Sequence, residues 1–124
     1  MQFEIAKTVP DPERVKATCR AVAKAARVGT AGLLVRVQML HYSSTRGRCY
    51  GDAIRVYRRG KPVIVNGYVK LWFQDWGQLA RTFAHELSHL RDARSPRVKR
   101  SKEKRATAFA DKVIGRIEAA EKEE

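Results

Sequence analysis

The stretch His85-Glu86-Leu87-Ser88-His89 is the one around which we expect the fold to be organised. On an α-helix, side chains four residues apart lie on one face, so both imidazoles point toward the same place. Glu86 lies about 100° round the helix from His85, so its side chain is close to that place but does not point in the same direction as the imidazoles. Imidazole is a common ligand of zinc, and a carboxylate beside such a site can act on a metal-bound water. The spacing therefore predicts a metal site with His85 and His89 as ligands and Glu86 as general base.

The residues around this stretch favour an amphipathic helix. Asp75 is a suitable N-cap, and Gln78 three residues later completes a pair that resembles a capping box. The helix should end near Arg94, because Pro96 disfavours helical geometry at the residue before it. Apolar residues recur at intervals of three and four along one side, at Trp76, Leu79, Ala80, Phe83, Leu87 and Leu90. The histidines then lie on the opposite, polar side.

A purely structural role for the same residues has to be weighed. A histidine on a helix is more often exposed or structural than a metal ligand, and Glu86 could be an ordinary surface carboxylate. The chain has three histidines, however, and two of them occupy this pattern. We therefore favour the metal site over coincidence.

The composition indicates one folded domain with an unusually basic surface. A chain of 124 residues is long enough for a single hydrophobic core, so we expect residues 1–124 to form one domain. The 26 basic and 13 acidic residues give a formal charge of +13, which favours contact with polyanions or acidic partners. A basic surface that is merely solvated is an equally good interpretation of this charge.

The chain lacks the sequence features of membrane and secreted proteins. No apolar run is long enough to span a membrane, and residues 1–5 do not resemble the start of a signal peptide. We therefore expect a cytoplasmic protein without membrane contact. Cys19 and Cys49 are interpreted as free buried thiols, because disulfides are typical of secreted chains.

The pattern of apolar and turn residues predicts an α+β fold. In chain order we expect a helix, three strands and two further helices, over residues 12–28, 32–40, 48–57, 63–65, 75–94 and 101–120. Asn66-Gly67 predicts a turn after the third strand, and residues 68–73 are ambiguous between a short strand and a lead-in to the next helix. The expected architecture is an N-terminal helix, a small twisted and mostly antiparallel sheet of about three strands, an active-site helix and a C-terminal helix.

A third metal ligand is expected from this last helix. A catalytic zinc site has three protein ligands and leaves a fourth position for water. The pattern Glu103-x-x-Ala106-x-x-Phe109-Ala110 puts a carboxylate in line with an apolar stripe, where it is costly unless paired or bound to metal. In the alternative interpretation, Glu103 only complements the dipole in the first turn of its helix. Pro96 lets the chain reverse, so the two helices can lie side by side.

The motif His85-Glu86-Leu87-Ser88-His89 and the later Glu103-x-x-Ala106-x-x-Phe109-Ala110 together resemble the motifs of the gluzincin metallopeptidases, above all the small single-domain minigluzincins. They are also similar to the peptidase domain of the phage-immunity and radiation-response regulators. The resemblance covers roughly the C-terminal half by motif, and the gap between the motifs is shorter than in most gluzincins. It implies a compact zincin-like domain that hydrolyses peptide bonds, with one catalytic Zn²⁺ held by His85, His89 and Glu103 and with Glu86 as general base.

A second resemblance rests on a different pair of segments. Arg46-Gly47-Arg48-Cys49-Tyr50-Gly51 and the later Thr82-Phe83-Ala84-His85-Glu86-Leu87-Ser88-His89 are similar to SprT-like proteases, which act on DNA-bound proteins. Those enzymes use a third histidine downstream, and this chain has none after His89. His41 lies upstream and could be a ligand only by an unusual arrangement. Asp92 could also bind metal, but we expect it to orient a histidine or to pair with an arginine.

The expected function is therefore zinc-dependent hydrolysis of a peptide or protein substrate. Tyr68, Tyr57 and His41 are candidates for stabilising the oxyanion, and they are not ranked. We expect the substrate to lie extended along an edge strand, formed by residues 63–65, and to add itself to the sheet.

Two rival functions remain open from the sequence. One is a basic nucleic-acid-binding protein whose metal site is structural or degenerate, and weak nucleic-acid contact is compatible with the charge. Closed structural zinc sites favour four ligands and paired cysteines, which Cys19 and Cys49 do not provide. The other is a latent peptidase blocked by its own N-terminal arm, through Pro10.

Overall fold

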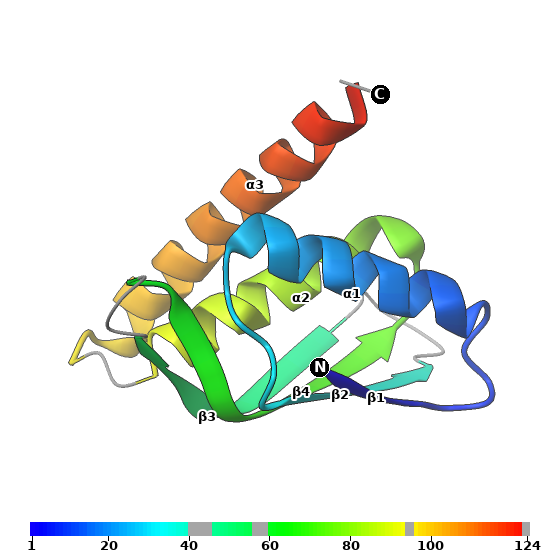
Figure 1. Cartoon of the computed structure of the whole chain (residues 1–124), viewed down its shortest axis with the longest axis horizontal. Helices are drawn as coiled ribbons and strands as arrows, with labels where there is room; N and C mark the ends of the chain where they lie inside the picture. Colours follow the sequence, from blue (N-terminus) through cyan, green and yellow to red (C-terminus); the bar gives the residue numbers. More distant parts are fainter. Residues whose placement is uncertain (40–45, 56–59, 94–95, 123–124) are drawn as a thin grey trace.

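The sheet and helices form two layers, with every described helix on one face of the sheet (Figure 1). The computed structural model describes residues 1–39, 46–55, 60–93 and 96–122. The elements in chain order are β1 (Gln2–Ile5), α1 (Pro12–Ala26), β2 (Leu33–Met39), β3 (Arg46–Arg55), β4 (Pro62–Phe73), α2 (Trp76–Arg91) and α3 (Lys99–Lys122). The predicted α+β class is confirmed.

Two of the helices begin at the caps that the sequence predicts. The Asp11 carboxylate accepts a hydrogen bond from the Arg14 amide at the start of α1, and the Asp75 carboxylate accepts one from the Gln78 amide at the start of α2. Each bond satisfies an amide that has no partner within its helix. Helix α1 ends at Ala26, two residues earlier than expected, because Arg27 takes a left-handed conformation with a φ of 57°.

The sheet differs from the expected one in both size and strand direction. Its four strands lie in the order β1-β2-β4-β3. Strand β1 pairs parallel with β2, and β2 pairs parallel with β4. Among the described strands, only β3 and β4 are antiparallel. The expectation of a mostly antiparallel sheet of about three strands is therefore wrong. The parallel pairing of β1 with β2 results from helix α1, which carries the chain back across the sheet so that both strands start at the same end.

Strand β4 runs without interruption through the predicted turn at Asn66-Gly67. In its ladder with β3, Ala53 pairs with Ile64 and Asp52 pairs with Asn66, which leaves Val65 without a partner. This extra residue is a β-bulge, and it allows Gly67 to return to the buried face. Opposite the bulge, Gly51 has a φ of 105°, a conformation that favours glycine. Since β4 lies between β2 and β3, the expected edge strand at residues 63–65 is also wrong.

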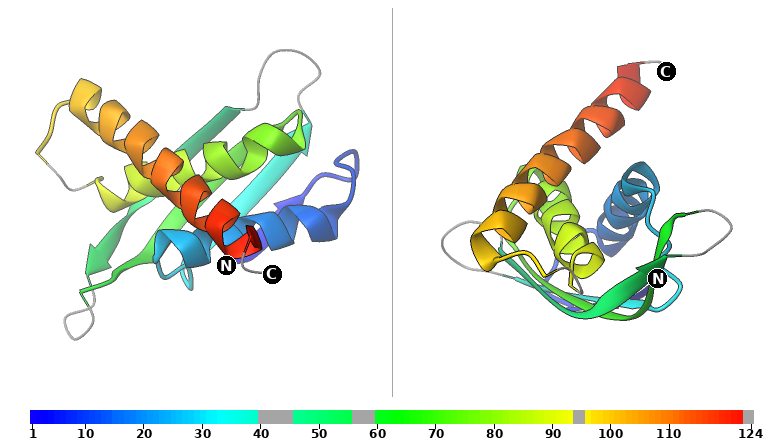
Figure 2. Two further views of the ribbon diagram at one scale, coloured as in Figure 1. Left: turned by 90° about the horizontal axis from the view of Figure 1, so that it is seen from above. Right: turned by 90° about the vertical axis from the view of Figure 1, so that its left-hand side faces the viewer.

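The hydrophobic core is formed by buried residues of the sheet and the helices. Figure 2 shows how these elements are arranged. Helices α1 and α2 lie against the sheet, and α3 packs across both of them. The largest side chains that are fully buried there include Phe83, Leu79, Leu87, Leu90, Leu71, Ile64, Val35 and Val22. Among the described helices, none is both long enough and apolar enough to cross a membrane.

The N-cap of α2 supplies a test of this local reasoning. Replacing Asp75 with alanine removes the acceptor for the Gln78 amide, so the free energy of unfolding should fall by about 1 kcal/mol. Asp75→Asn is the matched control, because asparagine caps a helix equally well. Urea unfolding at neutral pH measures both, and equal stability of the two variants would contradict the cap.

Candidate metal centre

Three side chains from two helices converge at one end of the molecule. His85 and His89 come from α2, and Glu103 comes from the first turns of α3. The Nε2 atoms of His85 and His89 are 3.1 Å apart. The Glu103 carboxylate places Oε2 3.2 Å from His85 Nε2 and Oε1 2.8 Å from His89 Nε2. The structure thus brings together the three residues that the sequence analysis assigns to the metal.

Because α2 is amphipathic, its histidine side chains point toward α3. Leu79, Phe83, Leu87 and Leu90 are buried on the core side of the helix. The histidine side chains are 26% and 20% exposed and lie at the border of that buried side. Helix α3 reaches them because Ala106 and Ala110 are small and buried, which lets the two helices approach closely. Glu103 stands one turn before Ala106 and faces the imidazoles.

The Glu86 carboxylate is buried beside this group and contacts strand β3. Glu86 is only 8% exposed. A Cβ atom added to Gly47 would lie 2.7 Å from Glu86 Cγ, so only glycine leaves room for the acid at this point of β3. Burial and the neighbouring negative charge of Glu86 raise the pKa of the Cys49 thiol. Cys49 is therefore protonated at neutral pH and can donate its hydrogen bond to Glu86.

An open cleft of about 770 Å³ gives access to these groups. One wall is formed by residues 47–51 of β3. The other is formed by the C-terminal part of α2 and the N-terminal part of α3, including Lys99 and Lys102. The contributions of Gly47 and Cys49 were not assigned from the sequence. Their signal is the alternation of small residues at positions 47, 49 and 51, which indicates that one face of the strand is closely approached by another element.

Asp92 pairs with arginines, one of the two roles expected for it. It is 7% exposed, and its carboxylate accepts hydrogen bonds from Arg105 Nε at 2.8 Å and from Arg105 Nη2 at 3.2 Å. Arg91 Nε lies 3.4 Å from the same carboxylate. Burial alone would raise the pKa of Asp92, but the hydrogen bonds and charges of Arg105 and Arg91 outweigh it, and the pKa is lowered. The pair ties the end of α2 to α3 two residues after Glu103.

Of the three oxyanion candidates, Tyr68 is the one that lies within the described residues, and it is not at the cluster. Tyr68 alternates along β4 with the buried Val69, so its side chain is on the sheet face away from the helices. Its ring lies 6.0 Å from that of Tyr50, measured between centroids. Tyr57 and His41 lie outside the described residues.

The chemistry of the donor set suits a metal ion. Two imidazole nitrogens and a carboxylate oxygen lie within 4.8 Å of one another, and the group could hold a metal ion. His85 Nε2 lies against both His89 Nε2 and Glu103 Oε2, and His89 Nε2 lies against Glu103 Oε1, so each of the three groups faces the other two. A shared cation would satisfy all three ligands at once.

Comparisons with models of known protein families, with curated proteins and with solved structures found no match for this chain.

The link between Asp92 and Arg105 makes stability depend on pH. Folding lowers the pKa of Asp92, so its ion pair stabilises the protein at pH values above 3.8, the ordinary pKa of an aspartate. This stability is lost as the pH falls through the lowered pKa of Asp92 in the folded protein. Asp92→Asn should lower the free energy of unfolding by about 2 kcal/mol at pH 7. Below pH 3.8 the difference from the wild-type protein should shrink toward zero.

Urea unfolding across this pH range measures the difference, with Glu118→Gln as control. Glu118 is an exposed acid on α3, so its replacement removes the same charge from a carboxylate that is not buried. A difference between wild type and Asp92→Asn that stays constant with pH would contradict the assignment.

Proposed function

We propose that the chain is a zinc-dependent metallopeptidase in which His85, His89 and Glu103 hold one zinc ion and Glu86 acts as general base. The observation that carries the proposal is the convergence of three ligand atoms next to a buried carboxylate in an open cleft. Two histidines and one glutamate are a donor set of catalytic zinc sites, in which the fourth position is left for water.

The distances in the cluster support this ion. Tetrahedral zinc with bonds of about 2.0–2.1 Å places its ligand atoms about 3.3 Å apart. The separations in the cluster are 3.1, 3.2 and 2.8 Å. The three atoms would need to move outward by only a few tenths of an ångström to admit the ion, a shift that side-chain rotation supplies.

The chain's own residues have separate tasks in the proposed reaction. A bound zinc ion would supply Lewis acidity and an acidified water. Glu86 is outside the ligand group, so its carboxylate is available to take a proton from the attacking water and to return it to the leaving amine. Gly47 leaves the space that this carboxylate occupies, and the protonated Cys49 thiol supports its charge.

The substrate would lie beside β3. This strand is at the edge of the described sheet, and its residues 47–51 line the cleft that contains the cluster. An extended peptide could add to β3 by main-chain hydrogen bonds, which would carry its scissile bond past Glu86. β3 therefore replaces the internal residues 63–65 as the proposed substrate strand. The N-terminal arm contains strand β1, which lies at the opposite edge of the sheet from β3.

The geometry favours this function over the two alternatives that involve nucleic acid. The third residue at the cluster is Glu103, in accordance with the gluzincin resemblance, whereas the SprT-like resemblance requires a histidine. A closed structural site would need a fourth ligand, and within the described part of the chain none joins the group. Cys19 is buried in α1, and Cys49 keeps its proton.

Removing the third ligand tests the metal site. Glu103→Ala should weaken zinc binding by more than about a hundredfold, since even the loss of an outer-shell partner costs ten- to a hundredfold. Competition with a fluorescent chelator measures the affinity, and Glu118→Ala on the same helix is the control. Zinc binding at wild-type strength in Glu103→Ala would move the third ligand to Asp92 or His41.

Removing the base tests the reaction. Glu86→Gln should retain zinc and lose hydrolysis by about 10²- to 10⁴-fold, because the amide cannot accept the proton. The measurement is cleavage of fluorescently labelled casein by the zinc-loaded protein, with Glu118→Gln as control. Full activity in Glu86→Gln would rule out the base, and a zinc-loaded wild-type protein that cleaves neither casein nor a random peptide library would contradict the peptidase.

A further inference from the structure

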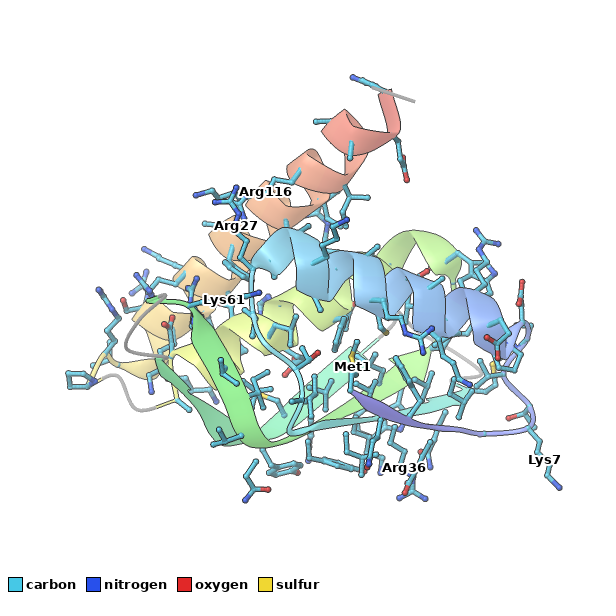
Figure 3. All side chains as sticks on the ribbon, viewed as in Figure 1. Met1, Lys7, Arg27, Arg36, Lys61 and Arg116 are labelled. Atoms are coloured by element: carbon cyan, nitrogen blue, oxygen red, sulfur yellow. The ribbon has the colours of Figure 1, made fainter. Side chains whose placement is uncertain are left out.

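The sheet has a second face, away from the helices, that carries aromatic and basic side chains. Its residues alternate along each strand with the core residues on the inner side. No described helix covers this outer face (Figure 1). Arg36 shows its direction plainly, because its side chain points away from the three helices (Figure 3).

The basic residues of the outer face form a row across three strands. In the sheet register, Arg48 of β3 pairs with Lys70 of β4, and Lys70 pairs with Arg36 of β2. Cross-strand partners share a face, and neighbouring strands are about 4.8 Å apart, so the row extends for roughly 10 Å. Three like charges in adjacent positions repel one another, and the fold offers little compensation. Glu4 of β1 is 3.9 Å from Arg36, but Arg48 and Lys70 have no acidic neighbour among the described side chains of β2, β3 and β4.

Aromatic rings flank this row on both sides. Tyr50 and Tyr68 are paired across β3 and β4, two residues from Arg48 and Lys70, with ring centroids 6.0 Å apart and planes inclined by 37°. Tyr50 is 58% exposed, a large fraction for an aromatic side chain. On the other side, the Lys70 ammonium lies 4.8 Å from the centre of the Trp72 ring. Each ring is thus adjacent to at least one cation of the row.

We propose that the outer face binds single-stranded nucleic acid, with phosphates along the row Arg48, Lys70 and Arg36 and bases stacked on Tyr50, Tyr68 and Trp72. Unpaired bases expose flat faces that stack on aromatic rings, and their backbone needs cations nearby. In a duplex those faces are already stacked on one another. An acidic peptide would use the cations without needing the rings. The net charge of +13 is of the sign required.

The side chains of this face are on the opposite side of the sheet from the metal cluster, although Arg48 and Tyr50 of the edge strand β3 also border the cleft that contains the cluster. The proposal is argued from the outer face alone and does not rest on the proposed peptidase. The binding experiment can be done in the presence of a chelator, where a failure of zinc chemistry has no effect on its outcome. The probes are fluorescein-labelled oligomers of fifteen thymidines and of fifteen uridines, and a DNA duplex of the same length, followed by fluorescence anisotropy. The two single strands distinguish DNA from RNA, and binding of either one supports the proposal.

The comparison with duplex separates stacking from simple charge attraction. Non-specific attraction favours the duplex, because its charge density is higher. We expect at least one single strand to bind about tenfold tighter than the duplex, which cannot offer its bases to the tyrosines. Duplex binding that is equal or tighter would overturn the proposal.

Variants on each set of residues locate the site. Tyr50→Leu/Tyr68→Leu should weaken single-strand binding by about tenfold or more with little change in its salt dependence, whereas Tyr50→Phe/Tyr68→Phe should retain it. Arg48→Gln/Lys70→Gln should reduce the slope of log K against log salt by about 0.7 for each lost phosphate contact. Should the double leucine variant unfold, the single change at the exposed Tyr50 tests the same ring.

The matched control removes the same charge from another basic region. Lys61 and Lys112 line a separate cleft of about 580 Å³ together with Arg27 and Arg116, on the helix side of the molecule (Figure 3). Lys61→Gln/Lys112→Gln should leave the affinity for the single strand nearly unchanged. An equal loss in both charge variants, or wild-type affinity in the double leucine variant, would overturn the proposed site.

Discussion

The packing of α3 against α2 is the constraint on which the site depends. His85 and His89 come from one helix and would point the same way in any helical context, but Glu103 must be supplied by a second helix. Small residues at Ala106 and Ala110 let α3 approach, and the ion pair between the buried Asp92 and the partly exposed Arg105 ties the helices near the cluster. Separating the helices would leave the buried carboxylate without this partner, so the link resists separation. Two imidazole nitrogens and a carboxylate oxygen are thereby held close together.

The sheet places different chemistry on its two faces. On the inner face, β3 lies against α2, and small residues such as Gly47 and Cys49 admit the buried carboxylate of Glu86. On the outer face, the alternate residues of the same strand are Arg48 and Tyr50, which are exposed. The period of two along a strand thus makes one short segment serve both the cleft and the aromatic-basic surface.

Local features of this fold could be predicted from the sequence, and long-range pairings could not. Helix α2 was predicted from its Asp75 cap and its apolar stripe, because these signals extend over a few residues. Glu103 was singled out from its place in line with Ala106, but its side chain is 50% exposed, so the expected cost of burying a carboxylate there is not what sets its position. The parallel pairing of Gln2 with Leu34 joins residues far apart in sequence, and no local pattern specifies it. Asn66-Gly67 has the composition of a turn, but pairing on both sides of β4 keeps it within the strand as part of a bulge. Cys49 at the cleft follows from that same pairing, which fixes the part of β3 that meets α2.

Anomalous diffraction at the zinc absorption edge, from crystals of the protein grown with zinc, tests the central arrangement most directly. We expect one anomalous peak bonded to Nε2 of His85, Nε2 of His89 and a carboxylate oxygen of Glu103, with Glu86 outside the bonding distance of about 2.2 Å. A peak that is bonded to Glu86 or Cys49 instead of Glu103, or the absence of zinc between the two histidines, would contradict it.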